Sequence, residues 1–121
     1  MKLPLQVTFH GLDHSDAVEE RVREKVSKLE QFYDRITSCR VAIELHHRNT
    51  SNLHQKGQPF HIRIDLTVPG TELVVRRDPK DSHEHEDIYV ALRDAFQSME
   101  RQLKEFATRQ RNDAKAAHAS A

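Results

Sequence analysis

Histidine is the side chain in this sequence that most invites a metal hypothesis, because nine occur among 121 residues. Zinc needs three or four ligands that converge as a tetrahedron, commonly at short fixed spacings. The chain has no HExxH motif, and Arg48 and Lys56 would repel a cation from the His-rich segment. We therefore expect no metal and a solvated loop at 46–58, which gains positive charge below about pH 6.5. The histidines considered are His46, His47, His54, His61, His83 and His85.

Nucleophilic and acid–base chemistry finds little support either. His85, Glu86 and Asp87 could form a hydrolytic cluster, but carboxylates at the start of a helix are explained by the helix dipole. Cys39 is the first inward residue of an alternating pattern, so we interpret it as a core residue. No serine or cysteine has an identifiable base. The lack of a recognisable nucleophile, base or metal-ligand set favours a protein that is not an enzyme.

Basic residues gather on one flank of a helical pattern near the N-terminus. At ~100° per residue, one line along the helix surface, which we call a lane, contains Arg21, Lys25 and Lys28, and Phe32 continues it. Helices built only for solubility tend to mix charges as i,i+4 pairs, so this segregation is informative. The back of the same helix collects acidic and amide residues, namely Glu20, Glu24 and Gln31.

A second basic lane lies on the last helical pattern, opposite its apolar stripe, with Glu100 at its border. Two such ridges on neighbouring helices would form a positive strip, which grips phosphate backbones without reading sequence. Ordinary solvated helix faces are the alternative interpretation. The lane on the last helix comprises Arg93, Gln97, Arg101, Lys104 and Arg111.

Two hydrophobic periods predict the elements that position these residues. Alternation predicts strands at 3–9, 39–45 and 60–68, and a fourth that begins at residue 73. Spacings of three and four predict helices at about 16–33, capped by Ser15, and at about 86–110. The resulting order is β-α-β-β-β-α. Because each helix has one apolar stripe, we expect an α+β fold with both helices on one face of a four-stranded mixed sheet.

Length and composition exclude several classes of protein. The length suits one domain, which we place at 1–111, followed by a disordered tail at 112–121 that has no apolar face to bury. Balanced charges, 19 basic and 19 acidic, exclude a polycation, and one cysteine excludes a disulfide framework. No apolar run approaches the ~20 residues of a membrane span, and the N-terminus does not read as a signal peptide. We expect a cytoplasmic protein.

Two segments resemble the bacterial ribosome hibernation-promoting factors and ribosome-associated inhibitors, formerly described as sigma-factor modulation proteins. The segment AVEERVREKVSKLEQFYDRI at 17–36 carries Lys-Leu-Glu at 28–30 and the pair Phe32-Tyr33 running into Asp-Arg-Ile. The segment HEDIYVALRDAFQSMERQLKEF at 85–106 is similar to the family's His-Glu-Asp-hydrophobic-Tyr helix start, followed by Glu-Arg-Gln-Leu. Both motifs occur in the expected order. The resemblance covers about residues 3–110 and is to the short form of the family.

The resemblance implies a fold similar to double-stranded RNA-binding domains. It implies binding in the mRNA and tRNA channel of the small ribosomal subunit, which blocks translation and protects idle ribosomes in stress or stationary phase. The expected partners are this subunit and its rRNA, for a monomer with no cofactor, membrane or small-molecule substrate. By matching positions, the family's RNA contacts are Lys25, Lys28, Arg101 and Lys104. The charge pattern alone adds Arg21, Arg76, Arg77 and Arg93.

Three departures from the family pattern accompany this resemblance. The loop after the second predicted strand is longer and richer in histidine than in short members, and the segment KEFATRQRND is less densely basic. The second domain through which long members pair ribosomes has no counterpart in these residues. The alternatives that stay open are a general double-stranded RNA-binding module, a metal-dependent enzyme that uses the His-rich loop, and a protein-interaction module.

Overall fold

The computed structural model describes residues 3–45, 60–78 and 87–119, with side chains up to residue 114. The predicted order of elements is confirmed, and the chain folds as a β-α-β-β-β-α unit. The elements are β1 (Leu5–His10), α1 (Asp16–Phe32), β2 (Ser38–Leu45), β3 (Phe60–Val68), β4 (Thr71–Arg77) and α2 (Ile88–Ala119).

The four strands form one mixed sheet in the order β1-β2-β3-β4. β1 runs parallel to β2, whereas β2–β3 and β3–β4 are antiparallel. The apolar residues Val41, Ile64 and Val75 lie opposite one another on neighbouring strands. Since side chains alternate along a strand, this register gives the sheet one apolar face.

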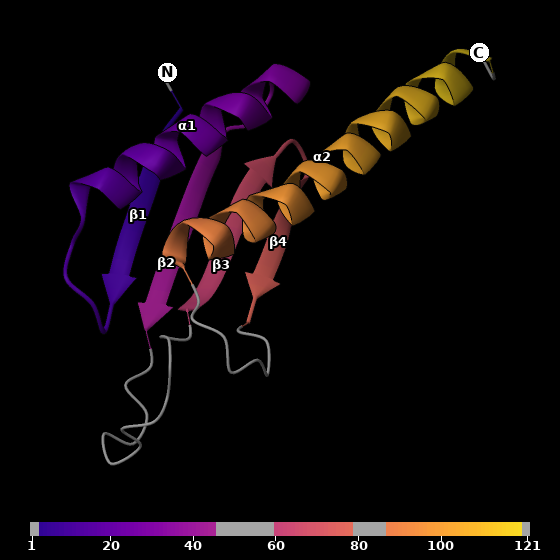
Figure 1. Cartoon of the computed structure of the whole chain (residues 1–121). Coiled ribbons are helices and arrows are strands. Elements are labelled where there is room, and N and C mark those ends of the chain that lie inside the picture. The colour runs from indigo at the N-terminus through magenta and orange to yellow at the C-terminus, as the bar shows by residue number, and fades with distance from the viewer. Residues whose placement is uncertain (1–2, 46–59, 79–86, 120–121) are drawn as a thin grey trace.

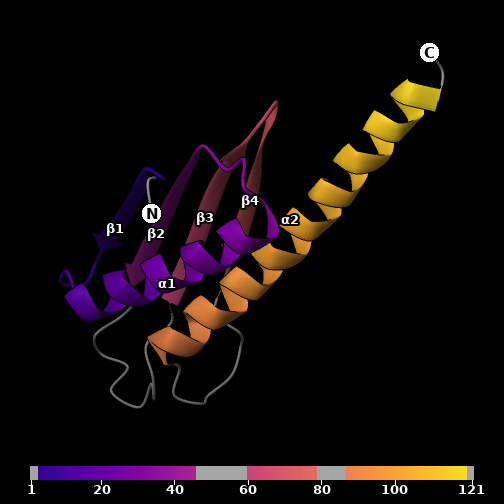
Figure 2. The ribbon, with the colours of Figure 1, turned by 90° about the horizontal axis from the view of Figure 1, so that it is seen from above.

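Both helices cover this apolar face, as Figures 1 and 2 show from two directions. The predicted α+β sheet with two helices on one face is thereby confirmed. No helix in the described ranges is long and apolar enough to cross a membrane. α1 contributes to the core Val18, Val22, Val26 and Leu29, and α2 contributes Ala91, Leu92, Ala95, Phe96, Met99 and Leu103.

Side-chain caps begin both helices. The Ser15 hydroxyl accepts a hydrogen bond from the Val18 amide at 3.2 Å, as predicted. Asp87, expected in the first turn of the second helix, instead precedes it: its carboxylate accepts from the Tyr89 amide at 2.8 Å and its carbonyl from the Ala91 amide at 3.0 Å. The carboxylate of Asp87 is therefore explained as a cap. His85 and Glu86 lie outside the described residues.

α2 is longer than the sequence pattern predicts. It continues to Ala119, so the helix end expected near residue 110 is wrong, and 112–119 have a helical backbone where a disordered tail was expected. A tail was expected because residues 112–121 have no apolar face to bury. A helix that is already formed can nevertheless continue through residues of high helix propensity, and this segment is rich in alanine. The Tyr33 hydroxyl, just after α1, donates to Gln110 Oε1 of α2 at 2.8 Å. The C-terminal part of α2 projects beyond the sheet and α1 (Figure 2).

Cys39 lies in the core, as expected, with 1% of its surface exposed. Burial raises the pKa of its thiol to about 12, and the negative charge of Asp65 adds to the effect. We expect the thiol to resist alkylation at about pH 8, because the thiolate is the reactive form. Mass spectrometry of iodoacetamide-treated protein should find Cys39 unmodified in buffer and modified in concentrated guanidinium chloride. Rapid labelling of the folded protein would contradict the burial.

Candidate nucleic-acid interface

Cationic side chains from both helices meet along a surface that we term the interhelical seam. The Arg21 guanidinium lies over the Tyr89 ring, with its carbon 4.8 Å from the ring centroid. Lys104 Nζ lies 4.4 Å from the centroid of Phe32. Such cation–π contacts hold a charged group over a ring. The Arg21 and Lys104 side chains nevertheless remain 44% and 53% exposed. The seam consists of Arg21, Lys28 and Phe32 from α1, and Tyr89, Glu100 and Lys104 from α2.

Glu100 lies between the two lysines of the seam. Its Oε1 is 3.8 Å from Lys28 Nζ, and its Oε2 is 3.6 Å from Lys104 Nζ. The lysine side chains are 62% and 53% exposed, whereas the Glu100 side chain is 26% exposed. The sequence placed Glu100 only at the border of a lane, but the fold makes it a bridge between the helices.

Two further predicted residues lie close to the seam. Lys25 is half-buried on α1, one turn from both Arg21 and Lys28. Arg93 is exposed on α2, one turn after Tyr89, and its Nη2 lies 3.4 Å from Asp94 Oδ1. The fold therefore groups five of the eight predicted residues: Arg21, Lys25, Lys28, Arg93 and Lys104.

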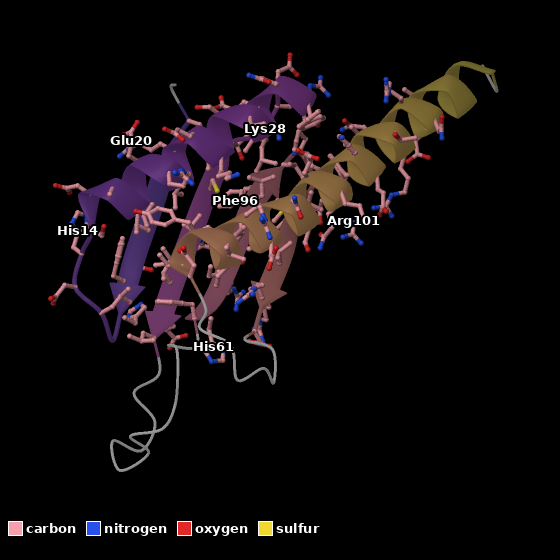
Figure 3. All side chains as sticks on the ribbon, viewed as in Figure 1. His14, Glu20, Lys28, His61, Phe96 and Arg101 are labelled. Carbon is pink, nitrogen blue, oxygen red and sulfur yellow. The ribbon has the colours of Figure 1, made fainter. Side chains whose placement is uncertain are left out.

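Arg101 and Arg76 form a separate group at the edge of the sheet. Both line an open depression of about 370 Å³ between β4 and α2, together with Ser98, Gln102 and Glu105. Figure 3 places Lys28 and Arg101 on opposite sides of the α2 ribbon. Arg101 therefore lies across α2 from Lys28, although both match family positions.

Arg77 is separated from Arg76 because neighbouring residues of a strand point to opposite faces. Its Nη2 lies 3.3 Å from Asp94 Oδ2 of α2, and its side chain is only 13% exposed. This ion pair joins β4 to α2 on the helix-covered side of the sheet. Arg77 is thus far less accessible than Arg21, Lys28, Arg93 and Lys104, whose side chains are 44–62% exposed. Asp94, which the sequence did not single out, pairs with Arg77.

The predicted segregation of charge on α1 is incomplete. Arg21 Nε lies 3.5 Å from Glu24 Oε2, and Arg23 Nη2 lies 3.3 Å from Glu19 Oε1. Long side chains reach neighbouring lanes, so a separation by helix angle does not prevent i,i+3 and i,i+4 pairs. Glu20 keeps its predicted place on the side of α1 away from α2 (Figure 3).

The described residues bring together one possible metal-ligand group that the sequence reading missed. Ligand atoms of His14, Asp16 and Glu19 lie within 4.8 Å of one another at the start of α1. The hydrogen bond from His14 and the positive charge of Arg23 hold the pKa of Glu19 below its usual value. The positively charged Arg23 side chain and the positive N-terminal end of α1 would both repel a bound cation. We assign no metal to the group.

Of the histidines considered as metal ligands from the sequence, only His61 lies within the described residues. His61 Nδ1 lies 2.9 Å from Asp78 Oδ1 at the end of the sheet, a contact that involves a single carboxylate. The other members of the set lie outside the described residues, namely His46, His47, His54, His83 and His85.

Comparison with protein families identifies the chain. The family model described as sigma 54 modulation protein / S30EA ribosomal protein matches residues 5–111. The chain belongs to this family. The match covers all four strands, α1, and α2 as far as residue 111, which includes the seam and the β4 depression. The resemblance noted from the two helical motifs is thereby confirmed.

Curated members of the S30EA family are similar along most of this chain. The ribosome hibernation promoting factor of Azotobacter vinelandii is 35% identical over 101 residues, which are 84% of this chain and 79% of that protein. The ribosome hibernation promotion factor of Deinococcus radiodurans is 30% identical over 104 residues. Those residues are 86% of this chain but only 49% of the Deinococcus protein, so the match spans about half of that relative.

Two solved structures share the fold of this S30EA member. A ribosomal subunit interface protein from Coxiella burnetii superposes with a TM-score of 0.68 at 17% identity, covering 88% of this chain and 99% of that one. The N-terminal domain of Protein Y from Thermus thermophilus gives 0.64 at 20% identity, covering 86% and 99%. At these identities the likeness concerns the fold alone.

Proposed function

We propose that this protein promotes ribosome hibernation. It binds the small ribosomal subunit in the channel for mRNA and tRNA, inhibits translation there and protects idle ribosomes under stress or in stationary phase. The observation that carries the proposal is the interhelical seam, in which two helices present cations along one surface. The names of the curated relatives, ribosome hibernation promoting and promotion factors, support the same function.

Capture of rRNA is electrostatic in this mechanism. Lysine and arginine displace counterions from the phosphate backbone, a contribution that does not depend on base sequence. The seam lies over the packed core, so its cations are held on a rigid body and meet phosphates at a fixed spacing. The first contact group is Arg21, Lys25, Lys28, Arg93 and Lys104.

The other predicted residues take different roles. Arg76 and Arg101 at the β4 depression form a second contact group, which can meet a separate strand of rRNA. Arg77 positions α2 on the sheet through Asp94. The two contact groups would hold rRNA phosphates on both sides of α2. The body of the fold would then occupy the volume that mRNA and tRNA need. No covalent step is required, and the protein acts as a monomer in the cytoplasm.

The direct test follows the protein through a sucrose gradient of lysate and through gradients of purified subunits. We expect it to sediment with small subunits and with whole ribosomes, and to be displaced by mRNA together with tRNA. Purified duplex RNA at the same nucleotide concentration should compete poorly, because the channel offers phosphates at several matched positions. Full competition by duplex RNA would favour a general RNA-binding module. Failure to sediment with either subunit would overturn the proposal.

A further inference from the structure

We infer that Glu100 is an internal competitor for RNA phosphate, a carboxylate that occupies an anion site between Lys28 and Lys104 and so lowers the affinity of the seam for rRNA. This inference rests on the proposed function and concerns how strongly the same site binds. Glu100 would thus weaken the binding of rRNA, whereas the basic residues around it strengthen that binding.

The geometry of Glu100 resembles that of a bound phosphodiester. Each of its two carboxylate oxygens faces one ammonium group, Oε1 toward Lys28 and Oε2 toward Lys104. A phosphodiester also carries one negative charge and two non-bridging oxygens. The two lysines come from different helices, so only the folded protein creates this two-cation site. Glu100 therefore stands where a backbone phosphate would make the same pair of contacts.

The ion pairs at Glu100 are loose enough to be exchanged. Their distances, 3.8 and 3.6 Å, exceed the ~2.7–2.9 Å of a charge-assisted hydrogen bond. Both lysine side chains are more than half exposed, and exposed ion pairs contribute little to stability. A carboxylate that organised the lysines for RNA would hold them in direct hydrogen bonds. The observed pairing instead lowers the positive potential at the seam without locking the lysines in place.

Lys104 has a second contact that does not depend on Glu100. Its ammonium lies over the ring of Phe32, a residue that is 38% exposed. Neutralising Glu100 should therefore leave Lys104 at the seam, with its charge available to RNA. The neighbouring core residue Met99 is fully buried and is untouched by such a change.

The test compares two variants with identical chemistry. Glu100→Gln and Glu20→Gln each remove one negative charge from a helix surface, but Glu20 lies on the side of α1 away from α2 (Figure 3). We expect E100Q to bind small subunits about three- to tenfold more tightly than wild type, and E20Q to stay within about twofold. Binding is measured by titration of labelled protein with purified small subunits at fixed salt.

A double-mutant cycle separates competition from a structural effect. In a Lys28→Gln/Lys104→Gln background, measured at low salt, E100Q should no longer tighten binding, because the two-cation site is gone. Equal or weaker binding by E100Q, with wild-type binding intact, would overturn the inference and leave the proposed function standing. Tightening that persists without the two lysines would overturn it as well. If the wild-type protein fails to bind small subunits, the proposed function itself falls.

Discussion

Replacing Arg21, Lys25 and Lys28 together by glutamate should lower the affinity for the small ribosomal subunit by about a hundredfold or more. Arg21 and Lys28 belong to the interhelical seam, and Lys25 lies between them on the same lane of α1. Each reversal replaces an attraction to phosphate by a repulsion. Co-sedimentation with purified small subunits measures the loss.

The fold should survive this triple substitution. Glutamate has nearly the helix propensity of lysine and arginine. The four buried residues of α1 lie on a different stripe, namely Val18, Val22, Val26 and Leu29. The lost contacts are the Arg21–Tyr89 cation–π contact and the pairs of Arg21 with Glu24 and of Lys28 with Glu100. These exposed contacts are worth about 1–2 kcal/mol in total, which lowers the melting temperature by about 3–8 °C.

A control on the same helix changes Glu20, Glu24 and Gln31 to alanine. This variant should retain binding or bind slightly more tightly, because it removes negative charge and frees Arg21 from its pair with Glu24. Circular dichroism verifies that both triple variants are folded. If the folded glutamate variant sedimented with small subunits as wild type does, the seam would not be the contact surface, whatever the family membership implies.

Raising the salt concentration from 50 to 200 mM should weaken binding of the small subunit by about three orders of magnitude, if about six phosphates are contacted. The first contact group of five cations at and beside the seam, with Arg76 and Arg101 at the β4 depression, supplies enough cations for that number, while Arg77 is paired with Asp94. The cause is the release of counterions from each neutralised phosphate. Titrations at several salt concentrations give the slope directly.

The same titrations on a milder variant provide the control for the salt prediction. Changing Lys25 and Lys28 to glutamine removes two phosphate contacts without adding repulsion, so the logarithmic slope should become shallower by about two. Changing Glu20 to glutamine should leave the slope unchanged. A nearly flat salt dependence of the wild-type protein would show that cations do not carry the binding.

The helices and strands of this protein are determined locally and could be predicted from the sequence. Alternating apolar residues from Cys39 to Leu45 and from Phe60 to Val68 correspond to β2 and β3, because only a period of two places them all on one face. Ser15 was predicted as a cap because its hydroxyl needs only the amide three residues later. α2 extends past its predicted end because helix propagation depends on propensity as well as on a buried face.

The candidate site depends on how the elements pack against one another. Helix angle assigns each residue to a lane, but the core decides which lane of α1 faces which lane of α2. It turns Lys104 toward Phe32 and Lys28, and Arg101 toward β4, although both belong to one predicted lane. The strand pleat likewise separates Arg76 from Arg77.

The sequence by itself therefore determined the family, the helices and strands, and which basic residues are available on each of them. Those features depend on residue type and on spacing within a single helix or strand. Only the tertiary structure decided that Arg21 meets Tyr89 and that Glu100 stands between Lys28 and Lys104. The Arg21–Tyr89 and Lys28–Glu100 contacts join side chains roughly 70 positions apart in the sequence, whereas Glu100 and Lys104 are neighbours on one helix. No periodicity within one element specifies the rotation of one helix against another.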